Sequence, residues 1–537
     1  MQRMLILLVF VCASTVQAQV KSQLFVDGEP FERQTLADTL DLKNYVQKLQ
    51  LRWVNQGYYF SGIDSVFRKD SISLIYLHKG AAHRVALSDY RGRKLQAYLS
   101  KQVQQYANHG YPFVSVALDS ARMSDGRLTG KLLLEPGPEI TYDSTYFFKE
   151  TKTGKGYIYQ LLDIVPEDNF SERAYGQIPK KVQRSPYLSL QRPVDLSFKN
   201  NKAKVFLDVK EEAASSFQGV LGLQQDANGK ASAVGSLELD LQNLFRSGKQ
   251  FTFSWERFSE QSQRLNVFYK HPFFLDSKIS PSFRFDLLKQ DTTFLTRKLG
   301  LGIHTYIAPR IELALAYEQN KGTLLSTDLN MLEQSGLAGF TRATYSVQFS
   351  QGDLFTLGKL KDGVVWRVLS LAGRKEVDRN LNVPDSYYDS LELSTNFYQF
   401  ESEIAYQVRM LKRQSFFHHI STGFTQNDQL LRNELYRIGG LTSLRGFNEK
   451  SVFARHYLLS RAEFRSFFEE ESYAYLFYDQ MLYQRGSLKD YPSGIGFGFA
   501  LATSAGQFSF AIGVGHSKDQ SISFSTMKAH FGYISRF

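Results

Sequence analysis

The chain has 537 residues, of which 43% are hydrophobic and 14% aromatic. This composition excludes a disordered protein, and the length leaves room for several domains. The formal net charge is +11, but lysine and arginine are dispersed along the chain, which favours acidic partners or anionic lipid head groups over nucleic acid.

The first 18 residues are predicted to be a secretory signal peptide. An arginine at position 3 precedes an apolar run over 4–13, and small residues at 16–18 form a cleavage site. The single cysteine, Cys12, lies inside this segment. The mature chain is therefore expected to have no disulfide, no thiolate chemistry and no cysteine-based metal site.

No later segment has the 18 or more consecutive apolar residues of a transmembrane helix. An exported protein without such a segment is either soluble or a β-barrel, because a closed barrel is the other structure that satisfies its backbone in lipid.

The N-terminal third contains an internal repeat. The hexamer Asn-Gln-Gly-Tyr-Tyr-Phe at 55–60 returns as Asn-His-Gly-Tyr-Pro-Phe at 108–113. Each copy follows an apolar stripe at spacings of three and four, which predicts a helix that its glycine ends. The stripes are Leu42, Tyr45, Val46, Leu49 and Trp53, then Leu95, Tyr98, Leu99, Val103 and Tyr106. We interpret these aromatic stripes as core packing.

Strand-like runs follow each helix and end in a second glycine, as in 74–80 and 132–137. We predict three small α+β units at 19–80, 81–137 and 138–212, each with the order strand, helix or helices, two strands. A sheet of this kind leaves an open edge that can accept an extended peptide as an added strand.

These units resemble polypeptide-transport-associated (POTRA) domains, on the Asn-x-Gly-Tyr-Pro-Phe stretch, the Asp125-Gly126 turn and Gly137. POTRA domains are periplasmic modules that precede a barrel in the outer-membrane assembly superfamily. The resemblance implies that the N-terminal third lies in the periplasm.

From 213 to 537 the pattern changes to segments of alternating hydrophobicity separated by polar or glycine-containing turns, which is typical of transmembrane β-strands. We predict a membrane β-barrel of 16 antiparallel strands. The predicted strands are 217–225, 231–241, 249–258, 263–272, 279–289, 294–306, 310–318, 338–350, 364–374, 392–407, 414–426, 454–467, 473–483, 494–503, 507–515 and 522–537.

Loop lengths agree with this strand count. If the first strand rises from the periplasm, the long connections all fall on the outer side, at 319–337, 375–391, 427–453 and 484–493. The inner turns are mostly short, and the connection at 351–363 is an exception that the pattern does not explain.

The last strands show two distinct faces. Ile495, Phe497, Phe499 and Leu501 alternate with Gly494, Gly496, Gly498 and Ala500, and the next strand repeats the pattern. We expect the large side chains to face lipid and the bare wall to face the lumen. The bare wall leaves space for a segment to pack closely against it, or else the glycines only relieve curvature.

The chain ends on an aromatic strand, with Phe531, Tyr533 and Phe537 on one predicted lipid-facing side. A final strand that ends in an aromatic residue resembles the signal by which outer-membrane barrels are themselves recognised for assembly. The resemblance implies the outer membrane of a Gram-negative bacterium.

The stretch 439–447, Gly-Gly-Leu-Thr-Ser-Leu-Arg-Gly-Phe, lies in the longest predicted outer loop. An arginine in a narrow or non-aqueous site must be paired with acidic groups. The two following strands offer Glu463 and Asp479, and Glu463 shares a face with Arg461 and Arg465 that lipid would reject. We therefore predict that Glu463, Asp479 and Arg445 meet in the lumen, although the tetrapeptide alone is also compatible with a surface turn.

Taken together, these features resemble the BamA, TamA and two-partner-secretion translocator superfamily (the bacterial surface antigen family), over essentially the whole mature chain. In that superfamily the tip of a long loop folds back into the barrel. The resemblance implies that Arg445, Gly446 and Phe447 form this tip, that Gly439-Gly440 correspond to the preceding glycine pair, and that Glu463 and Asp479 lock the tip in place.

The resemblance further implies a non-enzymatic mechanism, in which the seam between the first and last barrel strands opens towards lipid. Gly219, Gly222 and Gly532 are expected to weaken strand pairing there. The expected partners are unfolded outer-membrane or secreted polypeptides, outer-membrane lipids, and periplasmic or lipoprotein accessory proteins. The presence of three POTRA domains resembles TamA more than BamA. The alternatives to a function in polypeptide assembly or translocation are a secretion pore dedicated to one partner protein and a passive porin.

We expect no enzymatic activity, cofactor or metal. None of the ten histidines has metal-ligand spacing with carboxylates, and His418 and His419 point to opposite faces of a strand. Phosphate-loop, dinucleotide and Gly-x-Ser-x-Gly motifs are absent from the sequence. A Ser/His/acid set that converges only in three dimensions is the one enzymatic alternative that the sequence leaves open.

Overall fold

The computed structural model describes residues 20–36, 39–69, 72–87, 90–92, 94–225, 231–257, 259–326, 328, 332, 337–352, 362–503 and 506–536. The predicted signal peptide and Phe537 lie outside these residues. The chain forms two compact units, the first with 1–143, 167–175 and 197–204, the second with 144–166, 176–196 and 205–537. Among the described residues, the helices are too short or too polar to cross a membrane.

The first N-terminal module is a four-stranded sheet covered by one helix. Its elements are β1 (Val20–Val26), β2 (Glu29–Leu36), α1 (Thr39–Asn55), β3 (Gly62–Lys69) and β4 (Ile72–His78), with sheet order β2-β1-β4-β3 and β1 parallel to β4. The predicted helical stripe is buried, with Leu42, Val46, Leu49 and Trp53 packed on Leu24, Ile75 and Leu77.

The strand β2 is a departure from the predicted order, which placed a single strand before the helix. Asp27 and Gly28 both have positive φ, at 51° and 88°, and form a tight turn that sends the chain back along β1. The extra strand covers the β1 edge of the sheet and leaves β3 as the other edge strand.

The second module repeats this arrangement. Its elements are β5 (Arg84–Leu87), β6 (Arg91–Gly92), α2 (Leu95–Ala107), β7 (Ser115–Ser124) and β8 (Arg127–Glu135), in the order β6-β5-β8-β7. The predicted Asp125-Gly126 turn joins β7 to β8, and both residues have positive φ.

A third set of short elements follows. It comprises β9 (Thr141–Tyr142), β10 (Tyr146–Phe147), α3 (Lys155–Leu162), α4 (Glu172–Val182), β11 (Leu188–Leu190), β12 (Asp195–Lys199), β13 (Lys202–Leu207) and β14 (Val209–Glu211). Strand β13 pairs in parallel with β10 and with β9. Segments 144–166 and 176–196 of this region belong to the same compact unit as the C-terminal strands.

Within that unit, these segments are fastened to short turns between C-terminal strands. The Arg184 guanidinium donates to the carbonyl oxygen of Pro309 at 2.7 Å and lies over the ring of Tyr306, 4.1 Å from its centroid. The amide of Gly154 donates to Arg246 at 2.7 Å, and the Lys278 ammonium lies 2.9 Å from an Asp163 carboxylate oxygen. Hydrogen bonds to backbone carbonyls give this junction a defined geometry.

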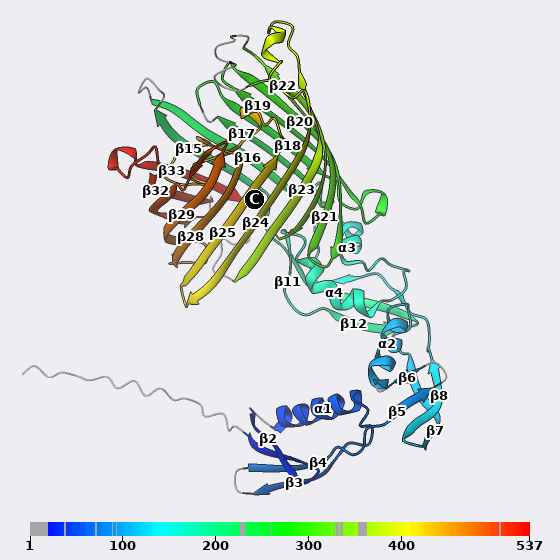
Figure 1. The fold of residues 1–537 in the computed structure, drawn as a ribbon. Coiled ribbons are helices and arrows are strands. Elements are labelled where there is room, and N and C mark those ends of the chain that lie inside the picture. Colours follow the sequence, from blue (N-terminus) through cyan, green and yellow to red (C-terminus); the bar gives the residue numbers. More distant parts are fainter. Residues whose placement is uncertain are drawn as a thin grey trace, which may run out of the picture. The chain divides into compact units, whose positions relative to one another are not determined.

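The C-terminal part closes into a barrel, whose strands lie side by side around its wall in Figure 1. Among the described residues, sixteen long antiparallel strands form the wall. They are β15 (Ser216–Gln225), β16 (Ala231–Leu244), β17 (Lys249–Arg257), β18 (Gln263–Lys270), β19 (Ser280–Gln290), β20 (Phe294–Ala308), β21 (Ile311–Leu324), β22 (Gly339–Gln351), β23 (Gly363–Asp378), β24 (Ser394–Leu411), β25 (Gln414–Gln426), β28 (His456–Phe467), β29 (Tyr473–Arg485), β31 (Ser493–Ala502), β32 (Gln507–His516) and β33 (Lys528–Arg536).

Among the residues that the structure describes, the connections between long strands contain three short strands, β26 (Tyr436–Ile438), β27 (Val452–Ala454) and β30 (Leu488–Asp490). The short 3-10 turns of this part are Phe274–Asp276, Asp385–Tyr387, Arg432–Glu434 and Phe524–Thr526. The predicted closed barrel of sixteen antiparallel strands is confirmed.

Several strands extend beyond their predicted outer ends. The sequence predicts that β21 ends at 318, but the strand runs to Leu324. Its last part, Glu-Gln-Asn-Lys-Gly at 318–322, is polar on both faces, so the alternation that marks a strand cannot be seen there. The last strand differs in the opposite sense: the sequence predicts a start at 522, but the strand begins at Lys528. Serines alternate with Ile522 and Phe524 there like a strand, yet the Ser523 hydroxyl accepts the amide of Ser525 and makes a turn.

The faces of the C-terminal strands follow the prediction. Ile495 and Phe497 are about half exposed on the outer surface, while Gly494, Gly498 and Ala500 are buried. The wall therefore presents an apolar band outwards, as a lipid-facing barrel requires.

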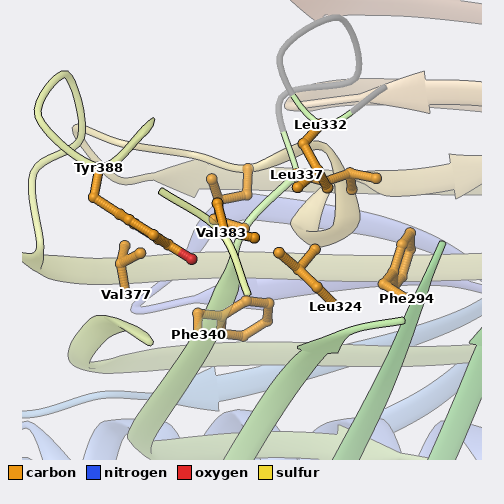
Figure 2. Close-up of a cluster of buried hydrophobic side chains, with 10 residues drawn as sticks. Phe294, Leu324, Leu332, Leu337, Phe340, Val377, Val383 and Tyr388 are labelled. Atoms are coloured by element: carbon orange, nitrogen blue, oxygen red, sulfur yellow. The ribbon is translucent and has the colours of Figure 1, made fainter. Parts of the chain in front are cut away.

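The outer ends of the strands carry a small hydrophobic core of their own, formed by strand ends together with loops (Figure 2). The outer-loop core consists of Phe294, Leu324, Leu332, Leu337, Ala338, Phe340, Val377, Val383, Tyr388 and Leu431. The connections after β21, β23 and β25 all contribute to it, so these loops pack on one another and fix the base of the long predicted loop at 427–453.

Candidate functional site

The long loop after β25 leads into the hairpin β26–β27, and its tip, 439–451, follows Ile438. The tip turns on glycines: Gly439, Gly440 and Gly446 have φ of 130°, 99° and 86°, which other residues adopt only with strain. Leu444 and Phe447 are buried with Leu459 and Met481 of the barrel wall. The tip therefore packs against the inside of the wall.

The structure brings Arg445 to both of its predicted acidic partners. Its Nε and Nη2 donate to the two oxygens of Asp479 at 2.8 and 2.6 Å, and its Nη1 donates to Glu463 at 2.6 Å. Its backbone amide donates to Asp479 as well, at 3.0 Å. Arg445 is 1% exposed, and its guanidinium lies 3.8 Å from the centre of the Phe477 ring.

Two further arginines complete the cluster. Arg465 pairs with the second oxygen of Glu463 at 2.7 Å, and Arg461 donates to the carbonyl oxygen of Thr442 in the tip at 2.9 Å. Buried charges are stable only when they are paired and hydrogen-bonded, and two carboxylates among three guanidinium groups meet that condition here. The cluster thus fixes the position of the tip against β28 and β29.

The bare glycine wall lies where the tip passes. A Cβ atom added at Gly494 would lie 2.0 Å from the carbonyl oxygen of Arg445, and one at Gly515 would lie 2.6 Å from that of Gly446. Phe477 fills the space beside Gly496 and Gly513. Close packing of the loop is therefore a direct consequence of these glycines, which leaves the curvature explanation unnecessary at Gly494 and Gly515.

We predict that Gly494→Val displaces the tip, because the branched side chain overlaps the backbone oxygen of Arg445 and the strand cannot move aside. Overpacking of this kind costs about 1–3 kcal/mol, or roughly tenfold or more in the docking equilibrium. A Leu444→Cys reporter, buried in the parent, should react with a maleimide about tenfold faster in the Gly494→Val background. Ile495→Ala, on the outer face of the same strand, is the control, and equal rates in all backgrounds would refute the close approach.

The base of the loop is held by a second buried ion cluster that the sequence did not reveal. Glu434 accepts from the Lys375 ammonium at 2.6 Å and from the Arg342 guanidinium at 3.0 Å. Lys375 is 0% exposed and Arg342 lies over the ring of Phe397 at 3.8 Å. The sequence shows Arg342 and Lys375 at lumen-facing positions of β22 and β23, but their partner, Glu434, lies far along the chain.

The predicted seam joins β15 to β33. Among the described residues it has six register pairs, from Ser216↔Arg536 to Leu221↔Phe531, compared with seven between β32 and β33 and fourteen between β20 and β21. Gly219 pairs with Tyr533, Gly532 pairs with Val220, and Gly222 lies just beyond the last pair. This junction is therefore short and contains glycine in both strands.

The predicted aromatic side of the last strand is present in part. Phe531 is 41% exposed, and the ring of Tyr533 lies 4.7 Å from that of Phe508 on β32. Phe537 lies outside the described residues.

The two adjacent histidines lie on opposite faces of β25, as the sequence predicts. Phe417 contacts the buried Arg465, so the odd positions face the lumen and His418 faces outwards. There the His418 ring forms hydrogen bonds with the hydroxyl groups of Ser460 at 2.8 Å and Tyr406 at 3.1 Å. This group contains no carboxylate, and its polar atoms satisfy one another. Within the described ranges, we find no cluster of three His, Cys, Asp or Glu side chains that could hold a metal ion.

The fold and this site define a class: a closed barrel of sixteen long strands among the described residues, with an apolar outer surface and a long outer loop that folds inwards and is locked by a buried arginine. Protein-family models and curated protein sequences give no match to the chain. Solved structures do match. CdiB from Acinetobacter baumannii is 12% identical over 93% of this chain and 97% of its own, with a TM-score of 0.55.

CdiB from Escherichia coli is also 12% identical, over 93% of this chain and 98% of its own, with a TM-score of 0.52. BamA from Haemophilus ducreyi, without POTRA domains 1–3, is 13% identical over 83% of this chain and 94% of its own, with a TM-score of 0.44. The chain therefore has the fold of the two CdiB structures.

Proposed function

We propose that this protein is an outer-membrane barrel of a Gram-negative bacterium that inserts other polypeptides into the membrane or exports them across it. The observation that carries the proposal is that the barrel combines a locked inner loop with a short seam between β15 and β33. A loop fastened by the buried Arg445 cluster gives the lumen side of the wall a fixed shape. The weakly paired seam is then the part of the wall that opens.

In this mechanism the substrate is an unfolded polypeptide and no bond is made or broken. The edge strand β3 captures an extended segment: among the described residues its partner in the sheet is β4, and Ile63, Val66 and Phe67 are exposed along it. The seam strands then separate, and the free edge of β15 offers backbone donors and acceptors to an incoming strand. Lipids around the seam and accessory periplasmic proteins or lipoproteins are further partners.

The inner loop argues against a passive porin. Its contacts reach β22 and β23 through Glu434, β19 through the Arg437–Gln290 hydrogen bond, and β28 and β29 through Arg445. A loop that touches walls this far apart in the strand order occupies the lumen through which solutes would diffuse.

The test is quantitative proteomics of the outer membrane after conditional depletion of this protein. A broad fall in barrel proteins is the result expected of an assembly factor. Loss of one or a few surface or secreted proteins would instead make it a dedicated secretion pore. If solute uptake fell while other proteins stayed at normal levels, the porin function would replace this proposal.

A further inference from the structure

The tip of the inner loop contacts the wall on both sides of the seam. On the C-terminal side, Glu449 lies 3.8 Å from His530 of the last strand, β33, and Leu441 lies beside Gly532 of the same strand. The carbonyl oxygen of Gly446 accepts from Gln520, which precedes β33. These contacts attach the tip to the strand that forms one edge of the seam.

On the N-terminal side, the Lys450 ammonium forms an ion pair with Glu256 of β17. Strands β15 and β16 lie between β17 and the seam in the sheet order. Residues 449 and 450 are neighbours in sequence, so one short segment reaches from β33 across the inside of the seam to β17. The loop therefore spans the junction that the proposed function opens.

The tip acts as one body because its own hydrogen bonds close it into a ring. The Lys450 amide donates to the carbonyl oxygen of Gly439 at 3.2 Å, and Glu449 accepts the amide of Leu441 at 2.9 Å. Gly440 donates to Leu444 at 3.1 Å, next to the buried Arg445. A displacement of β17 relative to β33 thus has to break a contact at one end of the tip.

The contacts that hold the tip on the two sides of the seam differ in burial: Arg445 anchors it to Asp479 of β29, which is joined to β33 through β31 and β32, and Lys450 anchors it to Glu256 of β17. The Arg445 and Asp479 side chains are 2% and 0% exposed, whereas those of Lys450 and Glu256 are 23% and 20% exposed. An ion pair that water reaches is weaker than a buried, multiply hydrogen-bonded one. The Lys450–Glu256 pair is therefore the contact that breaks first when the seam separates.

We propose that the tip, 439–451, is a strap across the inside of the seam, and that Lys450 and Glu256 are the positioning residues that hold the seam closed. The inference rests on the proposed lateral opening and deepens it. In the closed state Lys450 ties the N-terminal strands to the locked loop. Release of this pair lets β15 move away from β33 while Arg445 stays in place.

The experiment measures seam closure without any cargo. In the full chain, Phe217→Cys and Ser535→Cys place a register pair of cysteines across the seam, and a brief oxidation traps the closed molecules. We expect Lys450→Gln and Glu256→Gln each to slow cross-linking several-fold. The charge swap, Lys450→Glu with Glu256→Lys, should restore the parent rate. Lys298→Gln, which removes another partly exposed lysine from its ion pair with Glu318, is the control and should change nothing.

Parent rates in both single variants, or a swap no faster than the singles, would overturn the strap. If one single variant does not reach the membrane as a folded barrel, the other carries the test. The proposed function is tested separately, by outer-membrane proteomics after depletion of this protein. A normal proteome together with altered rates of cross-linking across the seam would refute the proposed function but not the strap.

Discussion

Cells whose only copy carries Arg445→Ala are expected to contain a folded barrel at normal abundance and to have lost its activity. The substitution leaves Glu463 and Asp479 buried, with Arg461 and Arg465 as the remaining cations. Removing one partner of a buried pair costs about 3–5 kcal/mol. That loss shifts the docking of the tip by a factor of roughly 100–1,000 or more.

The barrel itself is expected to survive because its strand ladder does not involve the Arg445 side chain. Abundance and heat-dependent gel mobility report folding, and restoration of the depletion phenotype reports activity. Arg445→Lys should recover little, since an ammonium cannot make the forked contacts to both carboxylates. Arg374→Ala, at an exposed arginine, is the control. Full activity of Arg445→Ala at normal abundance would end the locking role.

A disulfide across the seam is expected to abolish activity reversibly. Phe217 and Ser535 are register partners, and the predicted mature chain has no cysteine of its own, so Phe217→Cys with Ser535→Cys makes a single defined bond. Oxidised molecules cannot separate β15 from β33. Activity should fall to the level of the uncross-linked fraction and should return on reduction.

The matched control is Leu301→Cys with Tyr317→Cys, a register pair on the outer face of β20 and β21. Its disulfide should leave activity unchanged, because that junction stays closed in the proposed cycle. Equal activity of the seam-locked protein before and after reduction would show that the seam does not have to open.

The lock at Arg445 could be predicted from sequence because its parts carry local signals. Glycines on both sides mark a turn, and strand parity places Glu463 with Arg461 and Arg465 on the face that lipid excludes. The bare wall that includes Gly494 and Gly515 was compatible with a closely packed segment or with relief of curvature, and the loop packs there. The two-residue alternation of side chains is a property of a single strand, so it can be recognised in the sequence without knowing which strands are neighbours.

The contacts at the ends of the loop could not be predicted in this way. Glu434 meets Lys375 and Arg342, and Lys450 meets Glu256, across separations that no spacing rule links. Each of these charges alone is compatible with a solvated loop or an ordinary lumen wall. Their partners are decided by the path of the loop through the closed barrel, which depends on all of the strands together.

The measurement that tests the account most directly asks whether newly made polypeptides pass the seam. A photo-reactive phenylalanine analogue at Phe217, in the seam strand β15, is compared with the same analogue at Phe283, a lipid-exposed position of β19. In pulse-labelled cells, we expect adducts with labelled polypeptides at 217 that disappear during the chase, and none at 283. Absence of pulse-dependent adducts at 217, or equal adducts at both positions, would contradict polypeptide transfer through this seam.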